Sequence, residues 1–261
     1  MTQIDPAPRA KEPPIGQGVR KLGLDDQLPQ CEIVINRPIY ALEELAAGKS
    51  VVDIGCGYGR TRPVVEGVGG TWVGVEPFPG GGSTVTAFAE DLPFEDGSFE
   101  LVIMDAVLEH LPELEDSFAE VARVLKPGGK FVGYCAFMEC FHEISYHHLS
   151  FKALEHLSRK YGLVLTRVGG GNRFGIDHHL GVIFYPVPFE FVRMLIAASI
   201  RGIFRLKSLA AAAAIKFSRR LSWRDALAKG RDYYELECLR QSIGFTFVIE
   251  KPLGPESGAG S

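Results

Sequence analysis

The sequence lacks the cysteine pattern of a disulfide-bonded or zinc-binding protein. Its five cysteines, Cys31, Cys56, Cys135, Cys140 and Cys238, are odd in number and form no CxxC pair. We therefore predict neither a disulfide framework nor a bound metal, and a reducing, cytoplasmic location is favoured. The N-terminal stretch MTQIDPAPRAKEPP also lacks the apolar segment of a signal peptide, which agrees with that location.

Long apolar runs and an excess of positive charge are missing as well. The longest uncharged runs of the most apolar helical region, Met194–Ile200 and Ser208–Ile215, are far shorter than the roughly 20 residues that a membrane-spanning helix needs. There are 28 Lys and Arg residues against 32 Asp and Glu, which gives a net charge of −4. Because proteins that hold a phosphate backbone are usually basic, we predict no nucleic-acid partner. A homo-oligomer is compatible with this composition.

What is present is the pattern of an α/β protein. Short β-branched runs alternate with segments of helical spacing, which predicts βαβ units and a Rossmann-like, mostly parallel sheet with helices on both faces. The expected strands cover 51–54, 71–75, 100–104, 130–135, 163–168 and 244–250, and the expected helices cover 37–47, 112–125 and 151–160.

The expected domain organisation follows from the same pattern. Residues 1–30 and 252–261 are rich in proline, glycine and polar residues, and we predict a flexible N-terminal arm and a flexible tail. The core then comprises 31–168 and 243–251, and residues 169–242 form a mostly helical insertion. We interpret this insertion as a lid.

Basic residues gather in one part of the insertion. The stretch 189–221 contains seven Lys and Arg residues and one acid, Glu190. On a continuous helix, all the basic residues except Lys207 would fall within a half-circle, although Gly202 is expected to break the helix. A helical lid is the favoured interpretation, and a peripheral contact with an anionic membrane surface is the alternative.

The most informative motif follows the first expected strand, in VVDIGCGYG, residues 51–59. Gly55 and Gly57 allow a tight turn that can approach a ligand, with Cys56 between them. A dinucleotide site would read G-x-G-x-x-G without the preceding acid, and Asp53 would repel a pyrophosphate but suits an ammonium group. Glu76 ends the second strand, where an acid can accept both hydroxyls of a ribose.

Further acids follow the motif. Glu90 and Asp91 precede the third strand, where a carboxylate or a backbone N–H could meet an adenine edge. Asp105 ends the third strand and either lies at the mouth of the same site or caps a helix. A ligand with an ammonium group, a ribose and an adenine but no phosphate is S-adenosylmethionine.

Four segments resemble the class I S-adenosylmethionine-dependent methyltransferases, and within them the quinone and sterol methyltransferases. The segments are VVDIGCGYGR, GVEPF, AEDLPFEDGSFELVIMDAVLEHLPE and VARVLKPGGKFV. The resemblance covers roughly residues 35–135, more weakly 150–168, and implies a seven-stranded sheet whose antiparallel last strand would be Gly244–Glu250. The family's usual adenine-binding Asp is Phe88 here, so either Glu90 or Asp91 takes its role or Phe88 packs on the ring.

The acceptor is expected to be a small natural product or a saccharide hydroxyl. A hydroxyl benefits from a general base, and histidines cluster beyond the cofactor half, where the family builds its acceptor pocket. His147 is the first candidate for the base, followed by His142 and His178, with Glu143 or Asp177 as an orienting carboxylate.

Three alternatives stand beside this interpretation. The same histidines could hold a divalent metal, although the nearby acids are scattered. The enzyme could methylate a carbon atom of a quinone-like or sterol-like lipid at a membrane surface. The chain could also be a catalytically silent partner protein that binds S-adenosylmethionine.

Overall fold

The computed structural model describes residues 31–33, 41–138, 144–169, 190–240 and 242–254. The predicted arm at 1–30 and most of the predicted tail lie outside these residues. The strands are β1 (Glu32–Ile33), β2 (Ser50–Ile54), β3 (Thr71–Glu76), β4 (Val85–Thr86), β5 (Phe99–Asp105), β6 (Leu125–Ala136), β7 (Val164–Gly169) and β8 (Gly244–Glu250). The helices are α1 (Leu42–Ala46), α2 (Arg62–Gly67), the 3-10 helix η2 (Leu108–His110), α3 (Leu114–Val124), α4 (Phe151–Lys160), α6 (Glu190–Arg219) and α7 (Trp223–Arg240).

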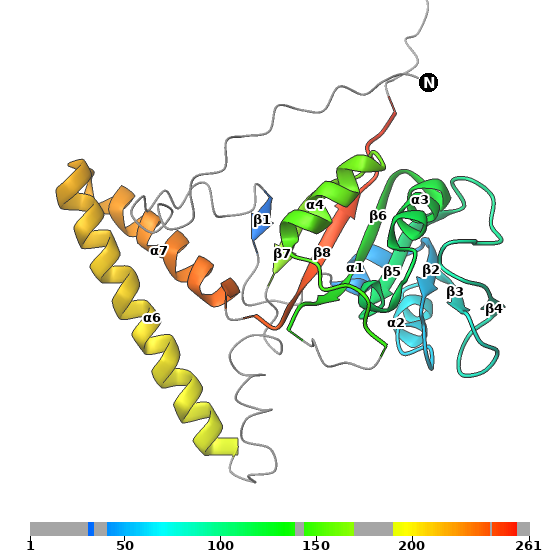
Figure 1. The fold of residues 1–261 in the computed structure, drawn as a ribbon, viewed down its shortest axis with the longest axis horizontal. Helices are drawn as coiled ribbons and strands as arrows, with labels where there is room; N and C mark the ends of the chain where they lie inside the picture. The colour runs from blue at the N-terminus through cyan, green and yellow to red at the C-terminus, as the bar shows by residue number, and fades with distance from the viewer. Residues whose placement is uncertain (1–30, 34–40, 139–143, 170–189, 241, 255–261) are drawn as a thin grey trace, which may run out of the picture.

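All the strands belong to one sheet with the order β1-β7-β8-β6-β5-β2-β3-β4 (Figure 1). The strand β8 lies between β6 and β7 and is antiparallel to both, whereas the other pairs are parallel. The predicted seven-stranded sheet with an antiparallel last strand is therefore confirmed. The sequence pattern did not reveal the two-residue edge strands β4, beside β3, and β1, beside β7, and β1 is an additional, eighth strand of the sheet.

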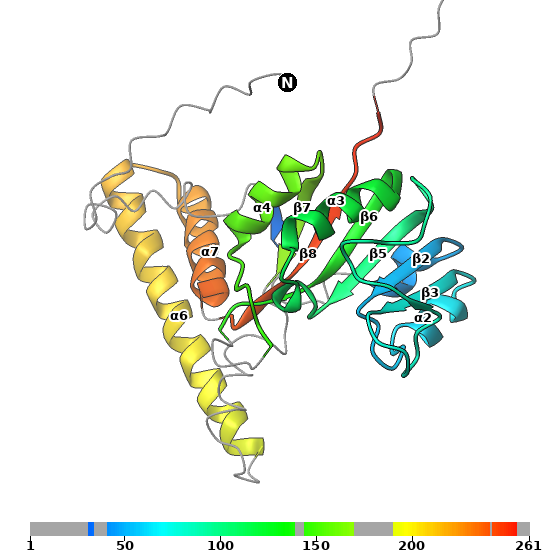
Figure 2. The ribbon, with the colours of Figure 1, turned by 45° about the vertical axis from the view of Figure 1, so that its right-hand side comes forward.

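The sheet is covered on both faces, and each face has its own apolar core. On one face, Phe118 of α3 packs edge-to-face on Phe131 of β6, which in turn contacts Phe247 of β8. Figure 2 shows α3 and α4 on this side of the sheet. On the other face, α1 and α2 contribute Leu42 and Val65 to a second core. The strands read as continuous apolar runs because both of their faces are buried.

Two boundary predictions need correction. The helix predicted over 112–125 begins at Leu114 and ends at Val124, because Leu125 already pairs with Phe99 of β5 as the first residue of β6. The predicted break at Gly202 is wrong, since α6 runs unbroken from Glu190 to Arg219. A glycine inside a helix costs only about 1 kcal/mol, and the long run of Ala, Leu, Lys and Arg around it offsets that cost.

The described part of the predicted insertion is a helical hairpin. The helices α6 and α7 pack along each other, and in both views they stand beside the β1 edge of the sheet (Figures 1 and 2). Residues 170–189, the first part of the insertion, lie outside the described residues. Of the described helices, none has the length and apolarity needed to cross a bilayer.

Candidate functional site

Three acidic residues converge at one edge of the sheet. The neighbouring parallel strands β2, β3 and β5 carry Asp53, Glu76 and Asp105 at or next to their carboxyl ends. Carboxyl ends of parallel strands meet at one edge, which is where open α/β sheets bind ligands. Burial is the largest cause that raises the pKa of Asp53, and the charges of Asp105 and Glu76 raise it further, so the three carboxyl groups lie near one another.

The glycine turn after β2 packs against neighbouring segments at Gly55 and faces open space at Gly57. Gly55 and Cys56 donate backbone N–H bonds to the Val75 carbonyl of β3, with N···O distances of 2.9 and 3.3 Å. Gly55 has a φ of +71°. A Cβ at this position would lie 2.5 Å from Cγ2 of Val107, so the turn packs directly against the chain after β5. At Gly57, with a φ of +54°, a Cβ would meet nothing within 4 Å, so this position faces open space.

Asp53 lies beneath the turn, where its side chain is only 2% exposed. The hydroxyl of Thr61 donates to Asp53 Oδ2, and Trp72 Nε1 donates to the same hydroxyl oxygen over 3.0 Å. Burial is the main cause that raises the pKa of Asp53 to about 6, while hydrogen bonding by Thr61 and Trp72 acts in the opposite direction. Thr61 and Trp72 were missed by the sequence reasoning, because their role depends on a contact between α2 and β3.

Glu76 and Cys56 have different positions around the same turn. Glu76 is half-buried at the end of β3, and its Oε1 accepts the backbone N–H of Gly57. Cys56 is 8% exposed and packs toward Gly74 of β3. Its thiol pKa is raised to about 12, first by burial and then by the charges of Asp53 and Glu76. The Cys56 side chain therefore packs against β3 as a neutral thiol.

Two exposed aromatic rings lie beside this acid cluster. Phe78 follows β3 and Phe88 follows β4, and they are 73% and 54% exposed. Their ring centroids are 6.5 Å apart in an edge-to-face arrangement. Glu90 is half-buried and Asp91 is exposed in the loop that follows Phe88. The sequence analysis did not single out Phe78 within the segment GVEPF, because its contact with Phe88 depends on the fold of the chain between β3 and the residues after β4.

Helix α3 fixes the loop that carries Glu90 and Asp91. The Leu92 N–H donates to Glu120 Oε2 over 2.8 Å. The Arg123 guanidinium donates to the carbonyls of Leu92 and Phe94 over 3.0 and 2.6 Å. This clamp was also missed from the sequence, because only the packing of α3 shows which loop Arg123 reaches.

His147 lies next to the chain that leaves β5. Its backbone N–H and that of Tyr146 donate to the Glu109 carbonyl of η2, and its Nε2 is 3.4 Å from the Pro112 carbonyl oxygen. His110 Nδ1 lies 3.1 Å from the Ile144 carbonyl oxygen, which binds the same two segments together. The segment with the first candidate base is therefore held near the carboxyl end of β5.

The other proposed acceptor-side residues are not described. His142, Glu143, Asp177 and His178 all lie outside the described residues. Within the part of the chain that is described, no three His, Cys, Asp or Glu side chains gather as a set of metal ligands.

Comparisons with known proteins agree in pointing to methyltransferases. Residues 52–133 match the family model described as a methyltransferase domain. An uncharacterized methyltransferase from Mycobacterium sp. (strain JLS) is 31% identical over 157 residues, which are 54% of this chain and 62% of that protein. A sterol 4-C-methyltransferase from Caenorhabditis elegans is 33% identical over 107 residues, which are 35% of this chain and 32% of that protein. This chain thus spans less than two thirds of these relatives.

The fold likeness agrees. A chain in the solved complex between the Trm112 methyltransferase activator and a methyltransferase from Haloferax volcanii has a TM-score of 0.50 and 18% identity, and the match covers 78% of this chain and 83% of that one. The matched family segment runs from β2 into β6 and so contains the glycine turn, Glu76 and the loop around Phe88. Residues 52–133 are therefore a methyltransferase domain of the class I S-adenosylmethionine-dependent kind.

Proposed function

We propose that this protein transfers a methyl group from S-adenosylmethionine to a small-molecule acceptor. The observation that carries the proposal is the convergence of Asp53, Glu76 and Asp105 on a glycine turn that is open at Gly57. Such a site repels phosphate groups and attracts a cation. S-adenosylmethionine carries an ammonium and a sulfonium charge, and when bound it supplies an electrophilic methyl group.

The described residues fit each part of this cofactor. Glu76 already accepts one N–H, from Gly57, and a carboxylate has further acceptor positions for two ribose hydroxyls. Buried Asp53 supplies the negative charge that an ammonium group requires. Phe78 and Phe88 present exposed apolar ring surface on which an adenine could pack.

The direct test is calorimetry of the purified chain with S-adenosylmethionine and, separately, with NAD. We expect binding of the first ligand only. Glu76→Ala should weaken that binding by roughly 10- to 100-fold, because two hydrogen bonds to a charged group are lost. The control is Glu66→Ala, which removes an exposed carboxylate from α2 that pairs with Arg62. Equal binding of NAD, or unchanged affinity in Glu76→Ala, would contradict the proposal.

We further propose that the acceptor atom is a hydroxyl oxygen of a natural product or saccharide and that His147 is the general base. Support comes from its position, since the segment with His147 is bound to η2 just beyond β5. In a displacement of this kind, the hydroxyl oxygen forms a bond to the methyl carbon as the carbon–sulfur bond breaks. The hydroxyl proton passes to the imidazole.

For His147→Gln, we expect kcat to fall by about 100-fold with little change in KM, because the variant holds the segment but cannot accept the proton at neutral pH. The acid limb of the pH–rate profile should also disappear. The matched control is His156→Gln, an exposed histidine on α4. An unchanged pH profile in His147→Gln would exclude it as the base.

Product analysis separates the main proposal from its alternatives. The likeness to a sterol 4-C-methyltransferase supports transfer to a carbon atom of a lipid acceptor as the second candidate. Mass spectrometry of the product distinguishes an O-methyl ether from a C-methyl group. Cofactor binding without turnover across lipid, phenolic and sugar acceptors would favour the silent partner protein.

A further inference from the structure

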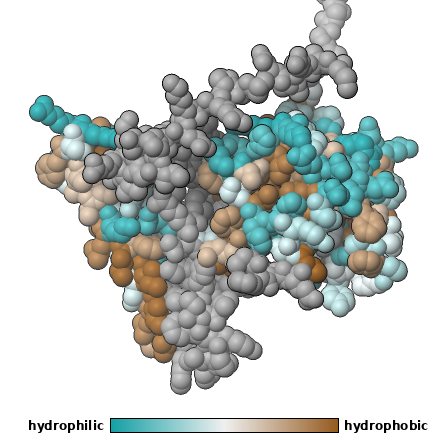
Figure 3. All heavy atoms as spheres, viewed as in Figure 1, coloured by the Kyte–Doolittle hydropathy of each residue, from teal (hydrophilic) through white to brown (hydrophobic). Residues whose placement is uncertain are grey.

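The outer face of α6 is apolar, which is the reverse of an ordinary surface helix. We define its outer stripe by residues that are exposed, uncharged and large and that share this face: Phe191, Val192, Leu195, Ile203, Leu206, Leu209 and Phe217. At 100° per residue they fall within an arc of about 120°. Met194, 56% exposed, lies outside the stripe. The two most exposed residues of the stripe are Phe217, at 73%, and Leu206, at 68%. Figure 3 shows this stripe as a brown band along the outer edge of α6.

The opposite face of α6 is already occupied by α7. Ser208 and Ala212 are buried there, and a Cβ on Gly230 of α7 would lie only 2.8 Å from Ala212 Cβ. Lys207 donates to Glu237 of α7 over 2.9 Å. Small residues and an ion pair close the middle of the hairpin. At its end, Phe217 of the stripe packs edge-to-face on Trp223 of α7, with ring centroids 6.3 Å apart. Phe217 nevertheless stays 73% exposed, and the other large side chains of the stripe are 43–68% exposed, so the hairpin leaves most of their surface uncovered. A surface helix normally shows the opposite arrangement.

Three basic residues of α6 border the stripe, Arg205 and Lys216 along one edge and Lys207 along the other. Helix α6 contains six Lys and Arg residues and a single acid, Glu190, although the whole chain has a net charge of −4. Near its end, the Lys216 ammonium lies 5.2 Å from the Phe217 ring centroid and 4.7 Å from that of Trp223. Lysine and tryptophan side chains with an apolar body and a polar end are enriched where a protein meets a membrane interface.

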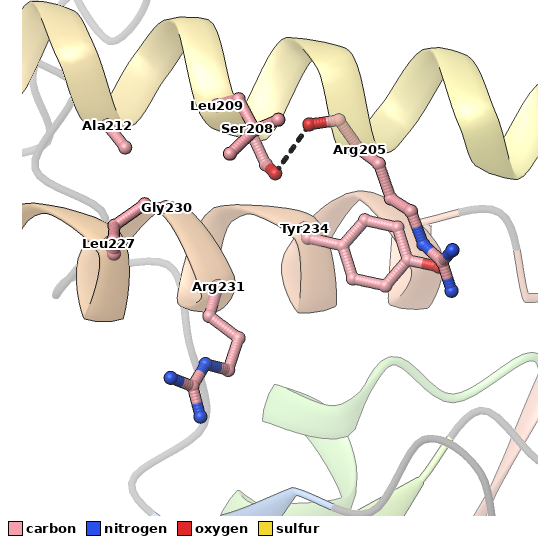
Figure 4. Close-up of a pocket in the computed structure, with 8 residues that line it drawn as sticks. All are labelled: Arg205, Ser208, Leu209, Ala212, Leu227, Gly230, Arg231 and Tyr234. Carbon is pink, nitrogen blue, oxygen red and sulfur yellow. Dashed lines mark hydrogen bonds between the residues drawn. The ribbon is translucent and has the colours of Figure 1, made fainter.

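A pocket between the helices extends this surface. It has a volume of about 360 Å³, and Leu209 of the stripe and Leu227 of α7 contribute to its lining. Figure 4 shows the Arg205 side chain beside the ring of Tyr234, with the guanidinium 5.9 Å from the ring centroid. Positive charge and apolar surface thus meet at the same groove, as an anionic amphiphile requires.

We propose that the α6–α7 hairpin docks on the surface of a bilayer that contains anionic phospholipid, with the outer stripe in the acyl boundary and the basic side chains among the headgroups. At 1.5 Å per residue, α6 is about 45 Å long and would lie in the plane of the membrane. Charge complementarity favours this occupant over a second copy of the chain, because two α6 helices would bring their basic residues together. The proposal does not depend on the methyltransferase activity.

The test is co-sedimentation of the full chain with vesicles of phosphatidylcholine, with and without about 30 mol% phosphatidylglycerol, whose anionic headgroups give the surface a negative potential that attracts Lys and Arg. We expect binding only to the anionic vesicles, with a blue shift of Trp223 fluorescence that is lost in Trp223→Phe. The pair Leu206→Ser and Phe217→Ser should reduce the partition coefficient at least tenfold. Because both side chains are exposed, the fold should survive, which circular dichroism and S-adenosylmethionine binding can check.

Matched controls make the outcome decisive. Leu253→Ser removes an equally exposed leucine that is not on the hairpin, and it should leave vesicle binding unchanged. Lys216→Gln with Arg219→Gln should weaken binding at low salt, whereas Arg159→Gln on α4 should not. Absence of anionic vesicle binding, or equal binding by the stripe variant, would overturn the proposal. A third result would also overturn it: the wild type forms a dimer in light scattering, the stripe variant is a monomer, and neither binds vesicles. That result would assign the stripe to contact with a second copy of the chain.

Discussion

The variant Asp53→Asn is expected to unfold at a higher temperature than the wild type at pH 8 and yet to bind S-adenosylmethionine roughly 100-fold more weakly. The stability gain arises because the folded protein must keep a carboxylate charged at a site that is 2% exposed. Asparagine preserves an acceptor for the Thr61 hydroxyl but carries no charge. The loss of affinity arises because the ammonium group would then lack its buried counter-charge.

The raised pKa of Asp53 determines how its effect on stability changes with pH. The pKa of Asp53 is about 6 in the folded protein, above the usual value of about 3.9 for an unfolded chain. The folded state therefore binds more protons between pH 4 and 6, so this group makes the protein less stable as the pH rises through that window. The full cost, on the order of 3 kcal/mol, is present above about pH 7. Below about pH 4 it vanishes, and the variant and the wild type should then be equally stable.

Urea unfolding at pH 8 and pH 4, together with calorimetry, measures both effects. Cofactor affinity of the wild type should rise as the pH increases from 5 to 7, because the cationic ligand favours ionised Asp53, and Asp53→Asn should show no such rise. The control is Asp116→Asn, an exposed acid in the first turn of α3. A variant that is no more stable at pH 8 and binds like the wild type would show that the buried charge has no part in the site.

The second large effect is expected at the glycine turn. Gly55→Ala places an L-residue at a φ of +71°, which costs about 1–2 kcal/mol. It also drives a Cβ to 2.5 Å from buried Val107, which adds roughly 1–3 kcal/mol of overpacking. Because the turn must move to relieve the contact, cofactor binding should be lost together with stability.

Gly48→Ala separates the two causes. Gly48 has nearly the same φ, +66°, but a Cβ there would meet nothing within 4 Å, and the residue lies before β2 at the far end from the site. We expect this variant to lose only the conformational term and to bind the cofactor normally. Adding Val107→Ala to Gly55→Ala should restore part of the cofactor affinity. Equal destabilisation by the two glycine variants would show that the Val107 contact has no effect.

Much of the fold could be predicted because local patterns and the sheet agree. The run at 51–54 is β-branched and apolar except at Asp53, which indicates a strand buried on both faces, and β2 is such a strand. In α3, within the helix predicted over 112–125, Leu114, Phe118 and Val121 are buried at the three- and four-residue spacing of an amphipathic helix. Strand β1 could not be predicted, because two residues carry no periodicity and their pairing depends on β7.

The amino-acid sequence by itself determined the longer strands and their alternation with helices, the glycine turn and the acids near three strand ends, since these follow from local spacing and from the rule that parallel strands share a carboxyl edge. Only the tertiary structure decided that Asp53 is buried under Thr61 and Trp72. It also decided that Phe78 joins Phe88, and that α6 turns its apolar face outward. These features depend on contacts between segments far apart in the chain, and the period of a helix states which residues share a face but not which face the rest of the protein covers.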